Sequence, residues 1–272
     1  TIRHLNFVQT LSIIIFVAIE NLRLFHKSLE QEAMRKELEL ASRMQSMLIP
    51  SPADMPKFQG VSIGSYYSPH FEVGGDYYDV IALSPNDMGF CIADVSGKGI
   101  SAALLMSNFQ ANLRALFSKD ISLSALVEKL NERVMATAKG EKFITMFIGR
   151  YNNQTRKLEY VNAGHNPPFI FVRNSGKIIQ LSSGCVGLGM IDEIPIINQG
   201  VLNIDEQSTL LCYTDGLVET IDGDRVVYNT SILEKNFSRN QNVQQIINTI
   251  AQVRESGADV FDDISILGFD FE

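Results

Sequence analysis

The sequence predicts an α+β domain of antiparallel strands behind one long N-terminal helix. Residues 5–48 contain neither glycine nor proline, and Pro50-Ser51-Pro52 follows them. Beyond residue 61, short apolar runs alternate with turn-forming sequences, which is the pattern of β-hairpins. Helical periodicity appears only between some of these runs, which favours antiparallel sheets over repeated βαβ units.

The long helix is expected to form a linker segment, residues 1–50. Its apolar residues repeat at alternating intervals of four and three, a heptad seam made of Leu11, Ile15, Ala18, Leu22, Phe25 and Leu29. The seam shifts phase near Glu32. A parallel coiled-coil homodimer with a break that stores two states is therefore expected, and a helix lying on its own domain is the alternative. The apolar run 11–19 is too short to insert into a membrane.

The other elements are predicted in chain order from their apolar periodicity and flanking turns. The hairpin turns are Ser84-Pro85-Asn86-Asp87, Asn152-Asn153-Gln154-Thr155 and Arg173-Asn174-Ser175-Gly176. The predicted elements are a strand at 61–67, strands at 77–83 and 88–95, helices at 100–117 and 123–138, strands at 146–151, 157–161, 169–172, 177–181 and 209–214, a helix at 243–254 and a strand at 264–271.

Charge and cysteine usage narrow the class of protein. The net charge is -8, which argues against a nucleic-acid partner because phosphate neutralisation needs a basic face. Cys91, Cys185 and Cys212 are far apart and form no CxxC pair, so neither a disulfide framework nor a zinc site is indicated. No signal peptide is visible. A cytoplasmic protein is expected, and Thr1 suggests a piece of a longer chain.

Aspartates at the ends of apolar runs are the strongest chemical signal in the chain. They are Asp76, Asp94, Asp215, and Asp262 or Asp263. Carboxylates gathered at a sheet edge repel one another unless a cation neutralises them. Ligands that offer only oxygen suit Mg²⁺ or Mn²⁺, so the pattern indicates a two-metal hydrolase. Turn and capping aspartates are the simpler interpretation of each residue taken alone.

One predicted hairpin brings two of these aspartates together. Asp76 and Asp94 are each nine residues from Pro85, so a three-residue loop pairs them directly and a four-residue loop displaces them by one. Gly74-Gly75 permits close backbone approach before Asp76. Gly97 and Gly99 leave room for a phosphate, and the helix that follows would favour an anion at its N-terminus.

Several motifs match one enzyme family in order along residues 39–272. They are residues 39–50 (ELASRMQSMLIP), 73–79 (VGGDYYD), 93–99 (ADVSGKG), 162–168 (NAGHNPP), 213–220 (YTDGLVET) and 262–265 (DDIS). The chain resembles the metal-dependent phosphatases of the protein phosphatase 2C superfamily (PPM). Within it, the chain is similar to the bacterial branch of the stage II sporulation phosphatase and the regulators of the general-stress sigma factor. Residues 11–25 resemble the last helix of a GAF sensor domain.

This resemblance implies an αββα sandwich of two antiparallel sheets for residues 51–272, with two Mn²⁺ or Mg²⁺ ions. Asp94 would bridge both ions beside Asp76 and the Val95 carbonyl. Asp215 and Asp262 would complete one ion, with Asp263 as the alternative ligand to Asp262. The implied reaction removes phosphate from phosphoserine or phosphothreonine by a metal-activated water, and the implied substrate is a STAS-domain anti-sigma-factor antagonist.

Other points stay open on the sequence. Lys98 and Lys142 are candidates for holding the phosphate, and surface charge is the simpler interpretation. His165 is either a general acid or a structural loop histidine. Gly74-Gly75-Asp76 is similar to the start of a cyclase motif, but tyrosines follow where an acidic residue is needed. A phosphatase-like module that only binds a partner is the alternative function. We also hypothesise that helix 5–48 controls the site through the helices between residues 99 and 138.

Overall fold

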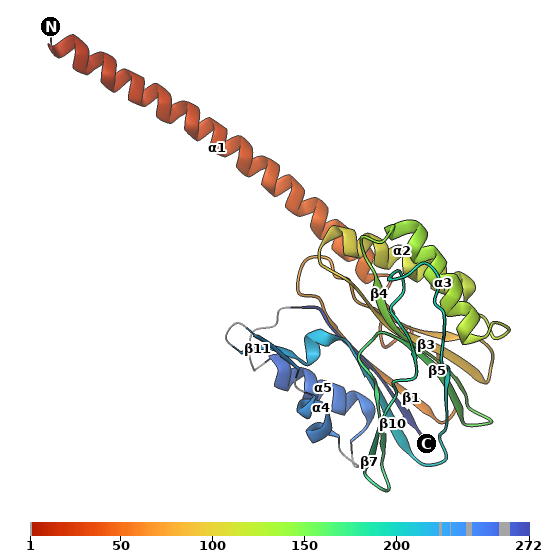
Figure 1. Ribbon diagram of the computed structural model, residues 1–272. Helices are drawn as coiled ribbons and strands as arrows, with labels where there is room; N and C mark the ends of the chain where they lie inside the picture. Colours follow the sequence, from red (N-terminus) through yellow and green to blue (C-terminus); the bar gives the residue numbers. More distant parts are fainter. Residues whose placement is uncertain (1, 223–224, 229, 238–240, 256–261) are drawn as a thin grey trace. The chain divides into compact units, whose positions relative to one another are not determined.

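The computed structural model describes residues 2–222, 225–228, 230–237, 241–255 and 262–272 (Figure 1). The chain divides into two compact units, residues 1–44 and 45–272. Helix α1, Ile2–Ser46, makes up the first unit and ends inside the second, as the absence of glycine and proline predicts. The division into a linker 1–50 and a catalytic domain 51–272 stays a prediction.

The apolar seam of α1 is exposed within its own unit. Leu11, Ile15, Leu22, Phe25 and Leu29 are 46–60% exposed. Ion pairs between residues three or four apart, such as Arg23 with Glu20, stabilise other parts of its surface. Among the described residues, no helix combines the length and the hydropathy that crossing a membrane requires.

One sheet of the second unit has five strands in the order β1-β13-β10-β6-β7, all antiparallel. Its bounds are β1 Val61–Ser68, β6 Phe169–Val172, β7 Lys177–Gln180, β10 Ser208–Tyr213 and β13 Ile264–Phe271. The central strand β10 is buried along its whole length, since β13 and β6 flank it.

The other large sheet has six strands in the order β2-β3-β4-β5-β8, with β9 also paired to β5. Its bounds are β2 Tyr77–Ala82, β3 Asp87–Val95, β4 Ile144–Asn152, β5 Lys157–Ala163, β8 Gly184–Cys185 and β9 Gly200–Asn203. Only the two-residue pairing of β5 with β8 is parallel, which departs from the expectation of a purely antiparallel sheet.

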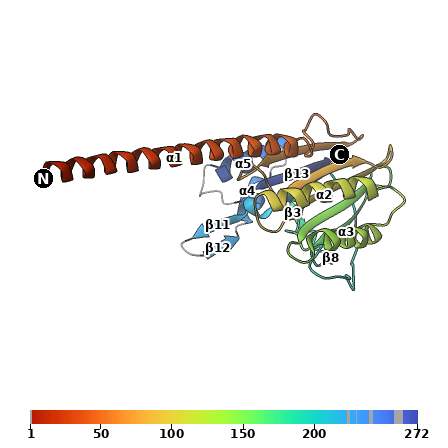
Figure 2. The same ribbon diagram turned by 90° about the horizontal axis from the view of Figure 1, so that it is seen from above.

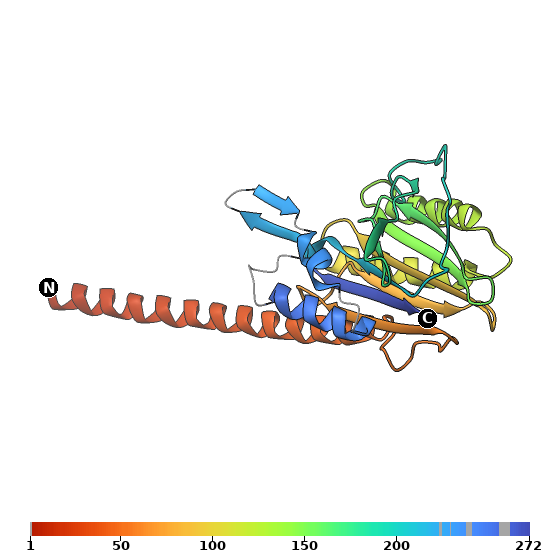
Figure 3. The same cartoon turned by 90° about the horizontal axis from the view of Figure 1, so that it is seen from below.

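Helices cover the outer faces of both sheets and complete the αββα sandwich. Helices α2, Ile100–Leu116, and α3, Leu123–Ala138, lie side by side over the six-stranded sheet (Figure 2). Helix α5, Val243–Glu255, packs on β1 and β13, with the short α4, Ser231–Asn236, beside it (Figure 3). Aromatic rings such as Phe90 on β3 and Phe269 on β13 meet between the sheets, with centroids 4.5 Å apart.

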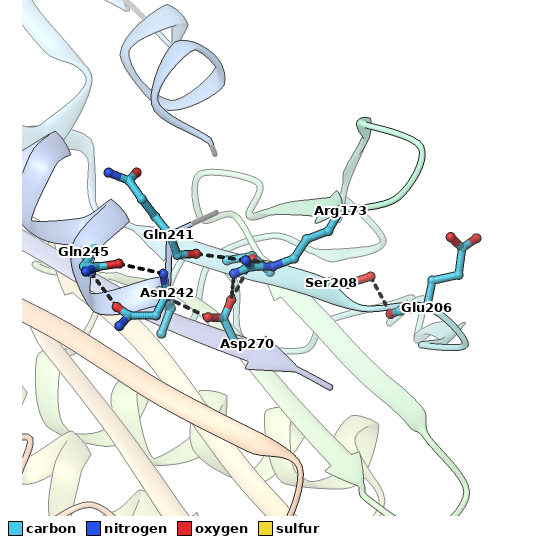
Figure 4. A network of polar contacts seen from close by, with 9 residues as sticks. Arg173, Glu206, Ser208, Gln241, Asn242, Gln245 and Asp270 are labelled. Atoms are coloured by element: carbon cyan, nitrogen blue, oxygen red, sulfur yellow. Dashed lines mark hydrogen bonds and ion pairs between the residues drawn. The ribbon is translucent and has the colours of Figure 1, made fainter. Parts of the chain in front are cut away.

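A polar network anchors the start of α5 to the five-stranded sheet (Figure 4). Arg173 donates to Asp270 Oδ1 at 2.6 Å and to the Gln241 carbonyl at 2.9 Å. The other Asp270 oxygen accepts from the Val243 amide at 2.7 Å, which satisfies a free N–H of the first helical turn. The helix is thereby fixed at this end, and its other end reaches the region of Asp215.

The predicted α+β class is confirmed, and each predicted helix and strand is present. The elements that the sequence did not indicate are β8, β9, α4, the 3₁₀ turn at Asp215–Leu217 and the hairpin β11–β12, Glu219–Asp222 with Arg225–Tyr228. They are two to six residues long. Segments this short carry too few side chains to show a period. The β11–β12 hairpin also stands apart from both large sheets (Figures 2 and 3).

Candidate metal centre

The β2–β3 hairpin brings Asp76 and Asp94 face to face. Its register pairs Tyr77 with Ala93 and Ala82 with Met88. Continued by one residue, this register sets Asp76 directly opposite Asp94, as the three-residue-loop version of the sequence argument predicts. Asp94 also pairs with Thr145 on β4, so the neighbouring strand supports it as well.

Asp76 is buried, and it is held from the opposite sheet. Its Oδ2 accepts a hydrogen bond from the Thr214 hydroxyl at 2.7 Å, and that hydroxyl oxygen accepts from the Ser265 amide at 2.9 Å. The ends of β10 and β13 are thus tied to the start of β2. Burial, and then the neighbouring Asp94 and Asp263, raise the pKa of Asp76 well above its ordinary value. The site therefore lies where the two sheets meet.

Asp215 begins the 3₁₀ turn that follows β10. The next residue, Gly216, lies so close to the Asp263 carbonyl that a side chain would collide with it. The buried Arg254 on α5 donates to the carbonyls of Gly216, at 3.2 Å, and Glu219, at 2.9 Å. Burial, and then the negative charges of Glu219 and Asp262, raise the pKa of Asp215 to about 6.

Asp262 and Asp263 have different surroundings, although they are neighbours in the chain. Asp263 is 7% exposed, and its two oxygens accept from the amides of His70, at 2.8 Å, and Gly75, at 2.7 Å. Asp262 lines the cleft and forms an ion pair with Lys98 at 2.9 Å. These contacts favour Asp262 as a metal ligand. They indicate that Asp263 instead stabilises the loop that contains His70 and Gly75.

A cleft of about 350 Å³ opens over Asp94, Asp215 and Asp262, whereas the buried Asp76 and Asp263 do not line it. Burial, and then Asp215, Asp262 and Asp263, raise the pKa of Asp94 to about 7. The Val95 carbonyl lies close to Gly75, where an added Cβ would be 2.9 Å from its oxygen. The cleft is lined by Asp94, Val95, Ser96, Gly97, Phe143, Thr145, Gly164, His165, Asn166, Asp215, Tyr228 and Asp262.

The two candidate lysines lie beside the cleft, and each has a partner. Lys142 donates to the Ser96 carbonyl at 2.7 Å, which fixes the loop after β3. Lys98 pairs with Asp262, so it already neutralises part of the carboxylate charge. Gly97 and Gly99 both have positive φ, at 76° and 80°, which is the freedom that the tight path into α2 requires.

His165 is 6% exposed, and its Nδ1 lies 2.9 Å from the Thr145 hydroxyl. Burial lowers the pKa of His165 to about 4, so the ring is neutral near pH 7. A neutral ring joined to the strand that pairs with Asp94 agrees with the structural interpretation of this histidine. A proton-donating imidazolium would need a far higher pKa.

The donor set of the cleft fits a hard divalent cation. It consists of carboxylate and carbonyl oxygens. Burial, and then repulsion by the neighbouring carboxylates, raise the pKa of Asp94, and a bound cation would offset both effects. Within the part of the chain that the structure describes, no three His, Cys, Asp or Glu side chains are already drawn together as a metal shell. The ligand roles of Asp76, Asp94, Val95, Asp215, Asp262 and Asp263 stay predictions.

Two residues that support the site were missed by the sequence argument. Thr214 holds Asp76, and Arg254 holds the turn that carries Asp215. Arg254 continues the apolar positions Ile247 and Ile250 of its helix, so its place on the buried face was a usable signal. Thr214 gave no signal beyond its position next to Asp215.

Comparison with known families identifies the family of this chain. Residues 84–272 match the family described as Stage II sporulation protein E (SpoIIE). The chain belongs to the SpoIIE family. It is 28% identical over 189 residues to the phosphoserine phosphatase RsbU of Bacillus subtilis, an alignment that covers 70% of this chain and 55% of RsbU. The chain spans about half the length of the curated relatives it matches, between 41% and 55%.

Solved structures show the same fold. The SiaA-PP2C domain of Pseudomonas aeruginosa has a TM-score of 0.72 at 18% identity, covering 89% of this chain and 98% of that one. RsbX in complex with magnesium has a TM-score of 0.60 at 16% identity, covering 80% of this chain and 98% of RsbX. At these identities the likeness establishes a PP2C-like fold, and the GAF-like character of residues 11–25 stays a prediction.

Proposed function

We propose that this chain is a metal-dependent protein phosphatase that hydrolyses phosphoserine or phosphothreonine on a regulatory protein. One observation carries the proposal: carboxylates from both sheets converge on one cleft in a SpoIIE-family chain. RsbU and RsbP, two relatives, are both named as phosphoserine phosphatases. A two-metal site with oxygen ligands is suited to the hydrolysis of a phosphate ester.

The proposed ligands are Asp76, Asp94, the Val95 carbonyl, Asp215 and Asp262. Two Mn²⁺ or Mg²⁺ ions held there would supply an acidified water nucleophile and screen the charge of the phosphate oxygens. Thr214 keeps the Asp76 carboxylate oriented, and Arg254 keeps the Asp215 turn in place. Lys98 forms an ion pair with Asp262, which lines the cleft, so it stays a candidate for contact with the phosphate.

We further propose that the substrate is a STAS-domain anti-sigma-factor antagonist, which is what the sequence resemblance implies. The kinship with RsbU and RsbP supports this choice of branch. The net charge of -8 argues against a nucleic-acid partner, so a phosphoprotein is the better match to the proposed metal cleft.

Control through the N-terminal helix is also a proposal. The exposed seam of α1 supports a coiled-coil homodimer below a GAF-like sensor. Contacts within the second unit support this proposal, because α2 begins shortly after Asp94 and is tied to β2. Arg114 on α2 donates to Asp79 at 2.7 and 2.9 Å, and Asp79 lies three residues beyond Asp76.

Hydrolysis of para-nitrophenyl phosphate tests the proposed activity. Turnover should require Mn²⁺, stop on addition of EDTA, and be lost in Asp94→Asn. If the chain shows no turnover but still binds a phosphorylated STAS protein, the alternative of a non-catalytic switch module replaces the enzyme. Turnover that survives both EDTA and Asp94→Asn would contradict the two-metal proposal.

A further inference from the structure

The last turn of α1 reaches the loop that carries Asp76 through one side chain, Gln45. This residue is 7% exposed. Its Nε2 donates to the Gly74 carbonyl at 2.7 Å, and its Oε1 accepts from the Gly74 amide at 3.1 Å. Gly74 lies before β2 and has no strand partner, so one side-chain amide satisfies both of its backbone groups in place of a strand.

The opposite side of the same loop is held by Asp263. Its Oδ2 accepts from the Gly75 amide at 2.7 Å. It also lies so near Gly74 that any side chain there would collide with it, and an added Cβ would be 2.7 Å from the Tyr67 hydroxyl. The two glycines are therefore fixed between Gln45 and Asp263, and the next residue along the chain is Asp76.

We propose that Gln45 is a positioning residue of the metal centre. It holds the Gly74 peptide, two residues before Asp76, in the place from which the chain sets Asp76 opposite Asp94, so the end of α1 is part of the proposed metal site. This inference rests on the proposed function, because it assigns Gln45 a role toward the ions that function requires. Groups that only orient a metal ligand commonly change metal affinity by about 10–100-fold when they are lost.

The chain supplies its own matched control. Gln244 on α5 forms the same pair of bonds with Ser65 on β1, donating to its carbonyl at 3.2 Å and accepting from its amide at 3.1 Å. Ser65 is already paired with Leu267 in the sheet, and it precedes no predicted ligand. Loss of either glutamine removes such a pair of hydrogen bonds to one backbone peptide, and loss of Gln244 also removes its bond to Asn248. Only Gln45 lies next to the ligand loop.

Calorimetric titration of the whole chain with Mn²⁺ tests the inference. Gln45→Ala should raise the Kd for Mn²⁺ by about tenfold, whereas Gln244→Ala should leave it unchanged. Gln45→Glu keeps the acceptor for the Gly74 amide and loses the donor, so its Kd should lie between those of the parent and Gln45→Ala. Hydrogen exchange of amides 74–76, followed by mass spectrometry without metal, should speed up in Gln45→Ala and not in Gln244→Ala.

The outcomes separate the inference from the proposed function. If the parent binds Mn²⁺ and Gln45→Ala binds it as tightly as Gln244→Ala does, the role of Gln45 is overturned and the metal site stands. If the parent binds no Mn²⁺, the proposed function and the inference both fail. Should Gln45→Ala not fold, Gln45→Glu decides: a Kd equal to that of the parent, with unchanged exchange at 74–76, overturns the role of Gln45.

Discussion

Single residues of the same type do different work in this site because their hydrogen-bond partners differ. Both carboxylate oxygens of Asp263 accept hydrogen bonds from backbone amides of a loop that lies almost two hundred residues earlier in the chain. Its neighbour Asp262 meets only the Asp263 amide and the Lys98 ammonium among the contacts described, and it faces the cleft. A carboxylate that is not committed to the fold is the one free to bind an ion.

Exchange of each carboxylate for an amide separates these two roles. Asp262→Asn should weaken Mn²⁺ binding by at least about tenfold, since even a group that merely orients a ligand has that effect. It should change the free energy of unfolding by less than about 1 kcal/mol, because its ion pair is partly exposed.

Asp263→Asn should instead lower the free energy of unfolding by about 1–3 kcal/mol, because an NH₂ group then faces a backbone N–H. Denaturant titration and calorimetry of both variants measure the two effects. Equal destabilisation by the two substitutions would contradict the assignment.

Buried His165 predicts a specific pH dependence of stability. Its pKa is about 4 in the folded chain, against an ordinary value of 6.5, so between these pH values the unfolded chain binds more protons. Stability from this group is fully present above pH 6.5 and is lost as pH falls toward 4. From pH 7 to pH 5 the loss is about 2 kcal/mol.

Comparison with His165→Asn isolates this contribution, because the raised pKa values of the aspartates act in both proteins. The difference in unfolding free energy between parent and variant should shrink by about 2 kcal/mol from pH 7 to pH 5 in urea titrations. A difference that stays constant over this range would mean that His165 is not buried as a neutral ring.

At the scale of elements, α1 has two parts of unlike character. The part of α1 in the first unit exposes the apolar seam, whereas Gln45 in the last turn is polar and buried. Exposed apolar residues at heptad spacing lose their contact with water when two such helices pair. The helix is thus suited to pairing along residues 2–44, and its last turn belongs to the unit that contains the cleft.

Charges placed on the seam test the pairing. Leu22→Lys with Phe25→Lys should convert the proposed homodimer to a monomer, because both positions face the partner helix in the heptad. Asn21→Lys adds a charge outside the seam and should leave the dimer intact. Light scattering after gel filtration gives the mass of each protein. A parent that is monomeric at all concentrations would contradict the coiled-coil proposal.

At the scale of the whole molecule, local patterns were enough to predict most of the fold. The position of the β2–β3 turn limits its register, so counting from Pro85 left only direct pairing of Asp76 with Asp94 or a displacement by one residue, and the structure has the direct pairing. The long helices and the hairpins likewise carry their period in consecutive residues. The very short β8 and the separate β11–β12 hairpin show no such period, because they have too few side chains to form a pattern of buried and exposed positions.

The rest of the site depends on contacts between distant segments, which no local pattern encodes. The choice between Asp262 and Asp263 depends on amides 188 and 193 residues away in sequence. The hydrogen bond from Thr214 to Asp76 joins residues that are 138 positions apart in the sequence. The hydrogen bond from Gln45 to Gly74 joins the last turn of α1 to the loop before β2. These contacts appear only when both sheets are assembled.

Metal stoichiometry tests the central claim most directly, namely that aspartates of both sheets form one two-metal site. Equilibrium dialysis of the whole chain against Mn²⁺ at pH 7.5, with Asp94→Asn and Gln244→Ala in parallel, measures it. We expect two ions for each parent chain and each Gln244→Ala chain, and fewer than two for Asp94→Asn. A parent that binds no Mn²⁺, or an Asp94→Asn variant that binds it as the parent does, would show that these aspartates form no such site.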